Sequence, residues 1–272
     1  MPEDVATFLP PHRVWDRGGD RPVLALHCSL AHAGAWGGLA EHLHGVTVTA
    51  IDMIGHGRAE DWDGVADLHT DAMRAAVAMA TEIGQGAPVD LMGHSFGATV
   101  CLRIALERPD LVRSLMLVEP VIFAAARAAG DPAYGPFRAR HEHLAALLAA
   151  DRRLDAAVDF HGYWGTGEAF ADLSPKMQSY ITDRMHLIAA QNPVLLDDAA
   201  GLLRYMGLES IGVPVLLVEG GDSPPIIDAV HRELARRLAQ VTRLAVPCAG
   251  HMVPITHAAA MQSAVMAHLA DA

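Results

Sequence analysis

The stretch that most constrains the fold runs from residue 89 to residue 98 and reads Val-Asp-Leu-Met-Gly-His-Ser-Phe-Gly-Ala. A short apolar run enters Gly-x-Ser-x-Gly and an alanine-rich helical pattern follows, which predicts a strand, a sharp turn and a helix. Gly93 and Gly97 carry no Cβ, so the strand and the helix can approach closely around Ser95. The Ser95 hydroxyl should then project from the sheet edge beside the free N–H groups of a helix N-terminus. We predict that Ser95 is a nucleophile and not part of an incidental glycine-rich turn.

Apolar runs alternate with helical patterns on both sides of this stretch. Continuous apolar runs predict buried strands at residues 22–26, 46–51, 114–118, 213–218 and 241–246. Strand–helix alternation predicts an α/β fold, with a mostly parallel sheet of eight strands, or nearly so, and helices on both faces. Short strands are also expected at residues 6–9 and 13–15, and residues 16–20 predict a hairpin turn.

The alternation stops between residues 121 and 208, which contain no convincing strand and are rich in alanine, leucine and charge. Loop signals occur at residues 130–132, at 165–167 and at Asn192-Pro193. We predict a core of residues 1–120 and 209–272, and a helical cap of residues 121–208 inserted after the sixth strand of the expected sheet.

Composition excludes several classes of function. The 272 residues carry a net charge of -12 and form no basic cluster, which argues against nucleic acid and against an anionic membrane surface as partners. The 16 histidines are scattered, and Cys28, Cys101 and Cys248 show no metal-ligand spacing, so we expect no metal and no cofactor. Cys101 and Cys248 are expected to be packing residues. The acidic start of the sequence has no apolar run, which favours a cytoplasmic protein.

Residues able to carry chemistry follow the ends of the predicted strands, where parallel sheets bind ligands. Ser95 needs a base, and His251, in a loop after the last strand, is the preferred candidate. His27 and His94 are alternatives. His94 flanks the serine and should point away from it, and His27 is expected to hydrogen-bond locally.

These motifs resemble those of the α/β-hydrolase superfamily, in a form with a helical cap. The resemblance rests on residues 93–97, on residues 52–58, on residues 249–251 and on the chain order serine, acid, histidine. It implies an oxyanion hole made by the N–H groups of Phe96 and Ser29. Cys28 stands where many members of the family have glycine.

Two residues compete for the acid. Many members place it in a Gly-x-x-Asp pattern after a late strand, but the third residue after Gly220 is Ser223, and Asp222 lies one position early. Some relatives, certain haloalkane dehalogenases among them, place it twenty-four residues after the nucleophile, which is Glu119 here. We prefer Glu119 and keep Asp222 as the alternative. A third interpretation is that Glu119 has no catalytic role and only caps the end of its strand.

The resemblance implies a serine-dependent hydrolase of a small, rather apolar ester, lactone or related acyl compound. Carbon–carbon bond hydrolysis, perhydrolysis or acyl transfer by the same residues are alternatives, and so is a non-catalytic receptor on the same fold. Candidate substrate contacts are His27, Cys28, His94, Tyr163 and Trp164. The sequence specifies no oligomeric state.

Overall fold

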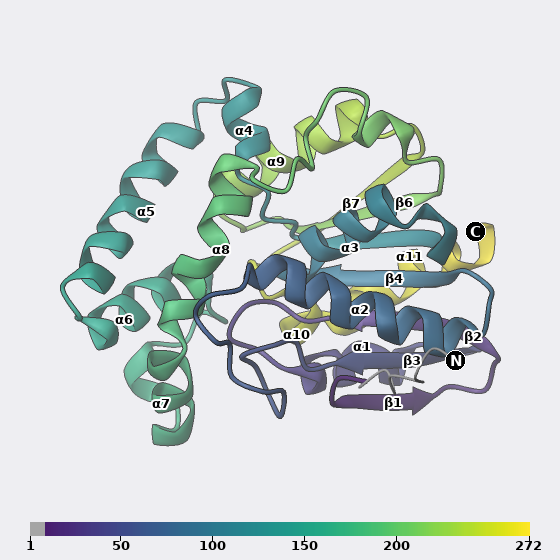
Figure 1. The fold of residues 1–272 in the computed structure, drawn as a ribbon, viewed down its shortest axis with the longest axis horizontal. Helices are drawn as coiled ribbons and strands as arrows, with labels where there is room; N and C mark the ends of the chain where they lie inside the picture. The colour runs from purple at the N-terminus through teal and green to yellow at the C-terminus, as the bar shows by residue number, and fades with distance from the viewer. Residues whose placement is uncertain (1–8) are drawn as a thin grey trace, which may run out of the picture.

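The protein was analysed as a computed structural model, which describes residues 9–272. In this part of the chain seven strands form one sheet in the order β1-β3-β2-β4-β5-β6-β7 (Figure 1). All neighbouring strands are parallel except β1 and β3. The mostly parallel sheet is confirmed, with seven strands. Their bounds are β1 His12–Asp16, β2 Arg21–Leu26, β3 Val46–Ile51, β4 Val89–His94, β5 Val112–Val118, β6 Val215–Gly220 and β7 Val241–Val246.

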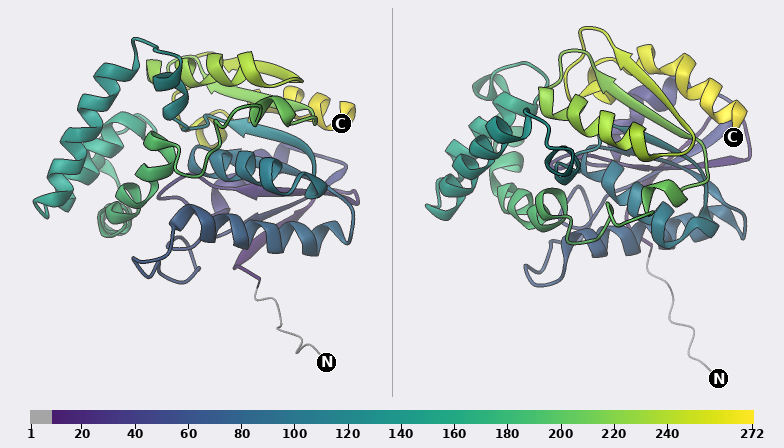
Figure 2. Two further views of the ribbon diagram at one scale, coloured as in Figure 1. Left: turned by 45° about the horizontal axis from the view of Figure 1, so that its top comes forward. Right: turned by 90° about the horizontal axis from the view of Figure 1, so that it is seen from above.

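Helices cover both faces of the sheet, because successive strand residues point to opposite sides (Figures 1 and 2). Leu24 and Leu26 of β2 pack in one hydrophobic cluster with α2, α3 and α9, whereas Val23 and Ala25 pack in another with α1 and α11. The bounds of these helices are α1 Gly37–His42, α2 Leu68–Gly84, α3 Phe96–Glu107, α9 Pro225–Arg237 and α11 Ala258–Asp271. A short helix, α10 Val253–Thr256, precedes α11.

The turn at residues 16–20 does not form the expected hairpin. β1 and β2 are not neighbours, since β3 lies between them. The turn instead crosses the start of β3, where the Arg17 N–H donates to the Val46 carbonyl and the Gly45 N–H donates to the Arg17 carbonyl. The strand expected at residues 13–15 is part of β1. The one expected at residues 6–9 lies, except for Leu9, outside the described residues.

Only helices and short turns lie between β5 and β6, to one side of the sheet (Figure 1). The helices are α4 Ala124–Ala128, α5 Tyr134–Ala149, α6 Arg153–Trp164, α7 Pro175–Asp183 and α8 Met185–Asp197. Helices α5 to α8 share a small apolar core that includes Leu144, Ala157 and Ile181, whereas the buried alanines of α4 belong to the larger cluster against the sheet. The prediction of a loop at Asn192-Pro193 is wrong, because α8 continues through Pro193. Burial of the next three residues, 194–196, favours the helix although proline removes one of its hydrogen bonds.

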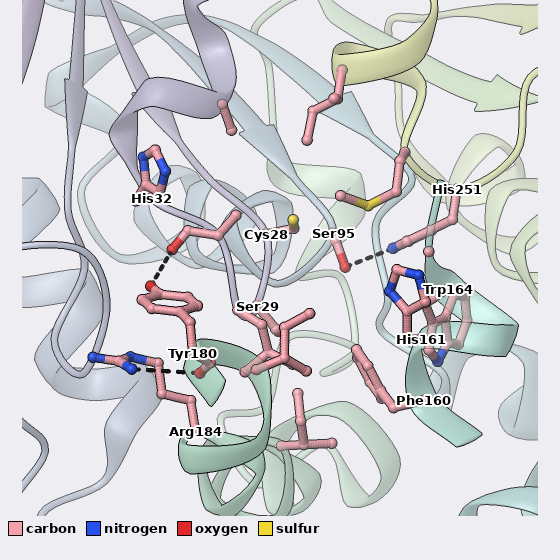
Figure 3. A pocket seen from close by; sticks show the side chains of 18 of the residues that line it. Cys28, Ser29, His32, Ser95, Phe160, His161, Trp164, Tyr180, Arg184 and His251 are labelled. Carbon is pink, nitrogen blue, oxygen red and sulfur yellow. Dashed lines mark hydrogen bonds between the residues drawn. The ribbon is translucent and has the colours of Figure 1, made fainter. Parts of the chain in front are cut away.

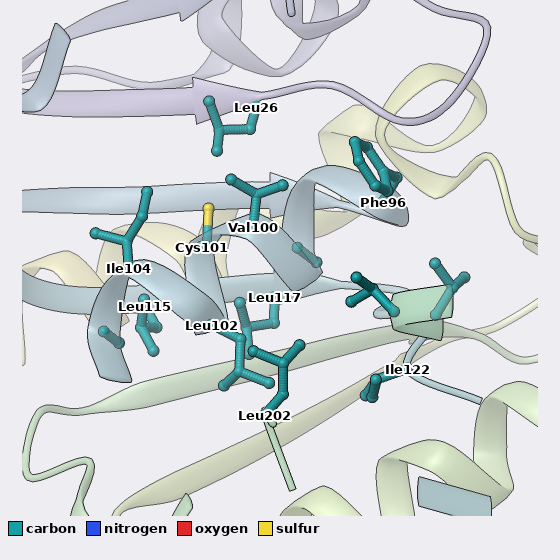
Figure 4. Close-up of a cluster of buried hydrophobic side chains, with 14 of the residues drawn as sticks. Leu26, Phe96, Val100, Cys101, Leu102, Ile104, Leu115, Leu117, Ile122 and Leu202 are labelled. Atoms are coloured by element: carbon teal, nitrogen blue, oxygen red, sulfur yellow. The ribbon is translucent and has the colours of Figure 1, made fainter. Parts of the chain in front are cut away.

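The two cysteines that were expected to pack in the core differ in their burial. Cys101 is fully buried among side chains of α3, β2 and β5, as predicted (Figure 4). Cys248 is exposed, because it sits in a turn after β7 with a positive φ of 60° that directs it away from the core. Within the described residues, no helix combines the length and the apolar character needed to cross a bilayer.

Candidate active site

Ser95 occupies a strained turn between β4 and α3. Its φ of 55° and ψ of -116° lie outside the regions that non-glycine residues prefer. A Cβ at Gly93 would overlap the backbone of Ala98, and one at Gly97 would overlap the carbonyls of Leu26 and His27. The two glycines therefore permit the close approach that presents the Ser95 hydroxyl at the carboxyl edge of the sheet.

His251 reaches Ser95 from the loop after β7. Its Nε2 lies 3.0 Å from the Ser95 Oγ, and its Nδ1 lies 2.7 Å from the Glu119 Oε2. The three side chains are almost completely excluded from water, with Glu119 fully buried. A carboxylate in this place fixes the imidazole with its proton on Nδ1, which leaves Nε2 free to accept the serine proton.

The end of β6 and the loop that follows it hold Glu119 and do not supply the acid. The Gly220 N–H and the Ser223 hydroxyl donate to the Glu119 Oε1 at 2.6 and 2.8 Å. Asp222 is exposed in the same loop, and no hydrogen bond joins its side chain to His251 within residues 9–272. The structure therefore brings Glu119 to the histidine and leaves Asp222 outside the cluster.

The other two histidines near Ser95 face away from it. The His94 Nε2 donates to the His251 carbonyl at 2.9 Å and so supports the loop of His251 from below. The His27 Nε2 accepts the Met53 N–H at 3.1 Å, while its Nδ1 donates to the Cys28 carbonyl. Burial lowers the pKa of His27 to about 3, so its ring is neutral. Neither residue lines the cavity, and their candidate role as substrate contacts is not supported by their positions.

The two backbone N–H groups expected to form the oxyanion hole make no hydrogen bond of their own within residues 9–272. Phe96 is the first residue of α3, and its N–H has no acceptor within the described residues; the same holds for the N–H of Ser29. Ser29 follows the end of β2, and its hydroxyl donates to the Gln191 Oε1 of α8 at 2.7 Å. Gln191 is a buried residue that ties the loop after β2 to the helices above it.

A cavity of about 960 Å³ opens over Ser95 and His251, between the sheet edge and α6, α7 and α8 (Figure 3). Cys28 and Trp164, two of the candidate substrate contacts, line it, and the centre of the Trp164 ring lies 4.6 Å from that of His251. Burial raises the pKa of the Cys28 thiol to about 12, so this thiol stays protonated and is no second nucleophile. Tyr163 does not line this cavity, because its ring packs under the Arg140 guanidinium.

Sequence reasoning missed several residues of the site. Gln191 lies in a helix without any recognisable motif. The donors to Glu119 are Gly220, at the end of β6, and Ser223, in the loop that also contains Asp222. A glycine and a serine at these positions form no motif, and only the fold shows that they face a carboxylate from another strand.

Three comparisons bear on this geometry. A sequence model of the family described as alpha/beta hydrolase fold matches residues 21–258. The chain is 31% identical to the lipase LipV of Mycobacterium tuberculosis, over 87% of this chain and 88% of that protein. It is 27% identical to a 2-hydroxymuconate semialdehyde hydrolase of Pseudomonas sp., over 94% and 89% of the two chains. A solved hydrolase structure from Pseudomonas aeruginosa superposes with a TM-score of 0.72 at 20% identity, over 95% of this chain and 93% of that one.

Proposed function

Since the chain belongs to the α/β-hydrolase family and is a hydrolase, we propose that it cleaves small acyl esters through an acyl-enzyme on Ser95. The observation that carries the proposal is the aligned set of Ser95, His251 and Glu119, with contacts of 3.0 and 2.7 Å. The similarity to a lipase favours an ester as the substrate.

The first half of the reaction forms the acyl-enzyme. The Ser95 Oγ attacks the ester carbonyl carbon while its proton passes to the His251 Nε2. The carbonyl π electrons move to oxygen, and the resulting oxyanion accepts hydrogen bonds from the N–H groups of Phe96 and Ser29. Such donors typically contribute about 3–4 kcal/mol each to the transition state. The tetrahedral intermediate then expels the alcohol, which takes the proton from His251.

The second half releases the acid. Water replaces the alcohol, gives a proton to the His251 Nε2 and attacks the acyl carbon through the same oxyanion geometry. The Ser95 Oγ leaves and recovers the proton. Glu119 keeps the imidazole oriented and stabilises its positive charge in both halves, without taking the proton itself.

The wall beside the nucleophile suits an apolar acyl group. Trp164 lies against the His251 ring, and Phe123 lies 5.9 Å from Trp164, both lining the cavity. Helices α6 and α8, within the proposed cap of residues 121–208, supply much of this wall. The cap is therefore proposed to select the substrate.

The alternatives use parts of the same cluster. Acyl transfer, perhydrolysis and carbon–carbon cleavage all begin at Ser95, so they differ in the bond that breaks or in the acceptor. A non-catalytic receptor gives no reason for Ser95, His251 and Glu119 to be aligned.

The test is a panel of p-nitrophenyl esters of increasing acyl length, assayed with the wild-type protein and with Ser95→Ala. We expect turnover by the wild type and a loss of several orders of magnitude in kcat for Ser95→Ala. Equal rates for the two proteins would refute the serine mechanism. Addition of an alcohol separates the alternatives, because an acyltransferase would form the new ester in place of the free acid.

A further inference from the structure

The charged side chains that line the cavity are mostly basic, although the chain as a whole is acidic. The sequence has 32 acidic and 20 basic residues. Among residues 9–272, the cavity is nevertheless lined by four cationic side chains and by a single carboxylate, that of Asp52. The four cations, which we call the cationic end of the cavity, are Arg13, Arg58, Lys176 and Arg184. Lys176 is the only lysine of the chain.

Hydrogen bonds and helix geometry place these four residues in one region. The Arg184 Nε donates to the Gly55 carbonyl at 3.1 Å, in the loop that also carries Arg58. The Arg58 Nη2 donates to the carbonyl of His12, the residue before Arg13, at 2.8 Å. Lys176 precedes Tyr180 by one helical turn of α7, and the Tyr180 hydroxyl accepts the Gly57 N–H at 3.0 Å.

Arg184 is held in place before any ligand arrives. Its guanidinium lies 4.0 Å from the centre of the Tyr180 ring, and its Nη1 donates to the Tyr180 carbonyl at 3.4 Å. Tyr180 is fixed in turn, because its hydroxyl donates to the Ala31 carbonyl at 3.0 Å. Figure 3 shows Arg184 and Tyr180 across the pocket from Ser95 and His251, with Cys28 and Ser29 between them.

The one carboxylate does not neutralise this region. Burial opposes the charged form of Asp52, but hydrogen bonds from the N–H groups of Ala33 and Arg58 outweigh it and lower the Asp52 pKa. Its negative charge is thus balanced by Arg58, whose Nε lies 3.4 Å away. Within residues 9–272, no ion pair engages Arg13, Lys176 or Arg184.

We propose that the substrate carries an anionic group, a carboxylate or a phosphate, on the end that lies away from Ser95, and that the cationic end binds it. The proposal rests on the proposed esterase function and refines its substrate from an apolar ester to an ester with one apolar and one anionic end. Arg184 is the main recognition residue, since a fixed guanidinium matches the two oxygens of such a group. Arg13 and Lys176 are more exposed and attract the anion over a longer, salt-dependent range, whereas the charge of Arg58 is balanced by Asp52.

The experiment compares two esters that differ only in the far charge: mono(p-nitrophenyl) adipate, and the same compound with its free carboxylate capped as a methyl ester. The measured quantity is the ratio of kcat/KM for the acid to kcat/KM for the capped ester. We expect a wild-type ratio of about ten or more at low salt, falling as salt is added. Arg184→Gln should lower this ratio about tenfold, and Arg184→Lys should restore part of it. An analogue with a terminal phosphonate distinguishes a preference for carboxylate from one for phosphate.

Two controls make the outcome decisive. Arg108→Gln removes an exposed arginine that pairs with Asp110 outside the cavity, and it should leave the ratio unchanged. Should Arg184→Gln fail to fold, Lys176→Gln removes an exposed cation of the same region, and a lower ratio is again expected. A wild-type ratio of one or below, or equal ratios in Arg184→Gln and Arg108→Gln, would overturn the proposal.

A failure of the proposed esterase function gives a different experimental result from a failure of the cationic end. If neither ester is cleaved faster by the wild type than by Ser95→Ala, the proposed function fails. Calorimetric binding of adipate against dimethyl adipate to the Ser95→Ala protein then still tests the cationic end. Binding of adipate without binding of dimethyl adipate supports the cationic end as an anion site. Equal binding of the two compounds, or binding of neither, contradicts it.

Discussion

Replacement of Glu119 by glutamine tests the assignment of the acid with almost no change in shape. In the structure the Glu119 Oε1 accepts two hydrogen bonds, from the Gly220 N–H at 2.6 Å and from the Ser223 hydroxyl at 2.8 Å. The Gly220 N–H can only donate, so the amide oxygen of a glutamine must occupy the Oε1 position. Its NH₂ group then faces the His251 Nδ1, where the carboxylate oxygen lies now at 2.7 Å.

The magnitude follows from the tautomer of His251. An NH₂ group forces Nδ1 to accept a hydrogen bond, and the imidazole proton moves to Nε2, which lies 3.0 Å from the Ser95 Oγ. A protonated Nε2 cannot accept the serine proton. The corresponding change in a serine protease lowers kcat about 10⁴-fold, which amounts to about 5 kcal/mol of transition-state stabilisation.

The assay is the steady-state hydrolysis of a p-nitrophenyl ester by Glu119→Gln, with Asp222→Asn as the matched control. We expect a fall in kcat of three to four orders of magnitude for Glu119→Gln, and rates within about twofold of wild type for Asp222→Asn, because the Asp222 side chain is exposed. Near-wild-type activity of Glu119→Gln together with a large loss in Asp222→Asn would refute the assignment.

Three further predictions concern the surroundings of the site and the core. His231 is fully buried, its ring nitrogens make no hydrogen bond within the described residues, the nearest carboxylate oxygen (Glu219 Oε2) lies 3.8 Å from its Nδ1, and burial lowers its pKa to about 3. The unfolded chain, with a histidine pKa of about 6.5, binds a proton that the folded chain excludes, so this residue makes stability fall as pH drops from about 6.5 toward 3. His231→Leu should remove roughly 1.4 kcal/mol per pH unit of that loss in urea unfolding between pH 6 and pH 5; parallel stability curves for the two proteins would contradict this. Gly220→Ala would place a methyl group against the carbonyls of Ala249 and Gly250, displace the loop of His251 and lower kcat about a hundredfold in the ester assay; unchanged kcat would show that the loop adapts. Gln191→Leu removes the acceptor of the Ser29 hydroxyl and should lower kcat about tenfold with little change in KM, with partial recovery in Gln191→Glu; an effect on KM alone would limit Gln191 to substrate binding.

The parts of the fold that sequence predicts well are those set by local sterics and patterning. Gly93 and Gly97 specify the turn around Ser95, because a side chain at either position would overlap neighbouring backbone. The pairing of β1 with β3 depends instead on which edge is free after the sheet assembles, and residues 16–20 are compatible with either partner. The continuation of α8 through Pro193 is likewise decided by burial of residues 194–196, which a local loop signal does not contain.

The residues of the site also fall into those that a local sequence pattern predicts and those that it does not. Ser95 and His251 follow from motifs, and the distance of twenty-four residues from Ser95 favours Glu119 as the acid. The hydrogen-bond donors that hold Glu119 and the contact between Gln191 and Ser29 join segments far apart in the chain, so no local pattern shows them. The cationic end is assembled from β1, the loop after β3 and the residues of α7 and its end, and the net charge of -12 gave no sign of it.

The most direct test of the central claim is covalent labelling of Ser95 with a serine-directed fluorophosphonate, followed by intact-mass and peptide analysis. The account predicts one adduct per chain, located on Ser95, with loss of esterase activity in proportion to labelling. It also predicts that Glu119→Gln labels far more slowly than Asp222→Asn, because only the first substitution disables the base. A protein that hydrolyses esters while Ser95 stays unlabelled, or that labels at another residue, would contradict the account.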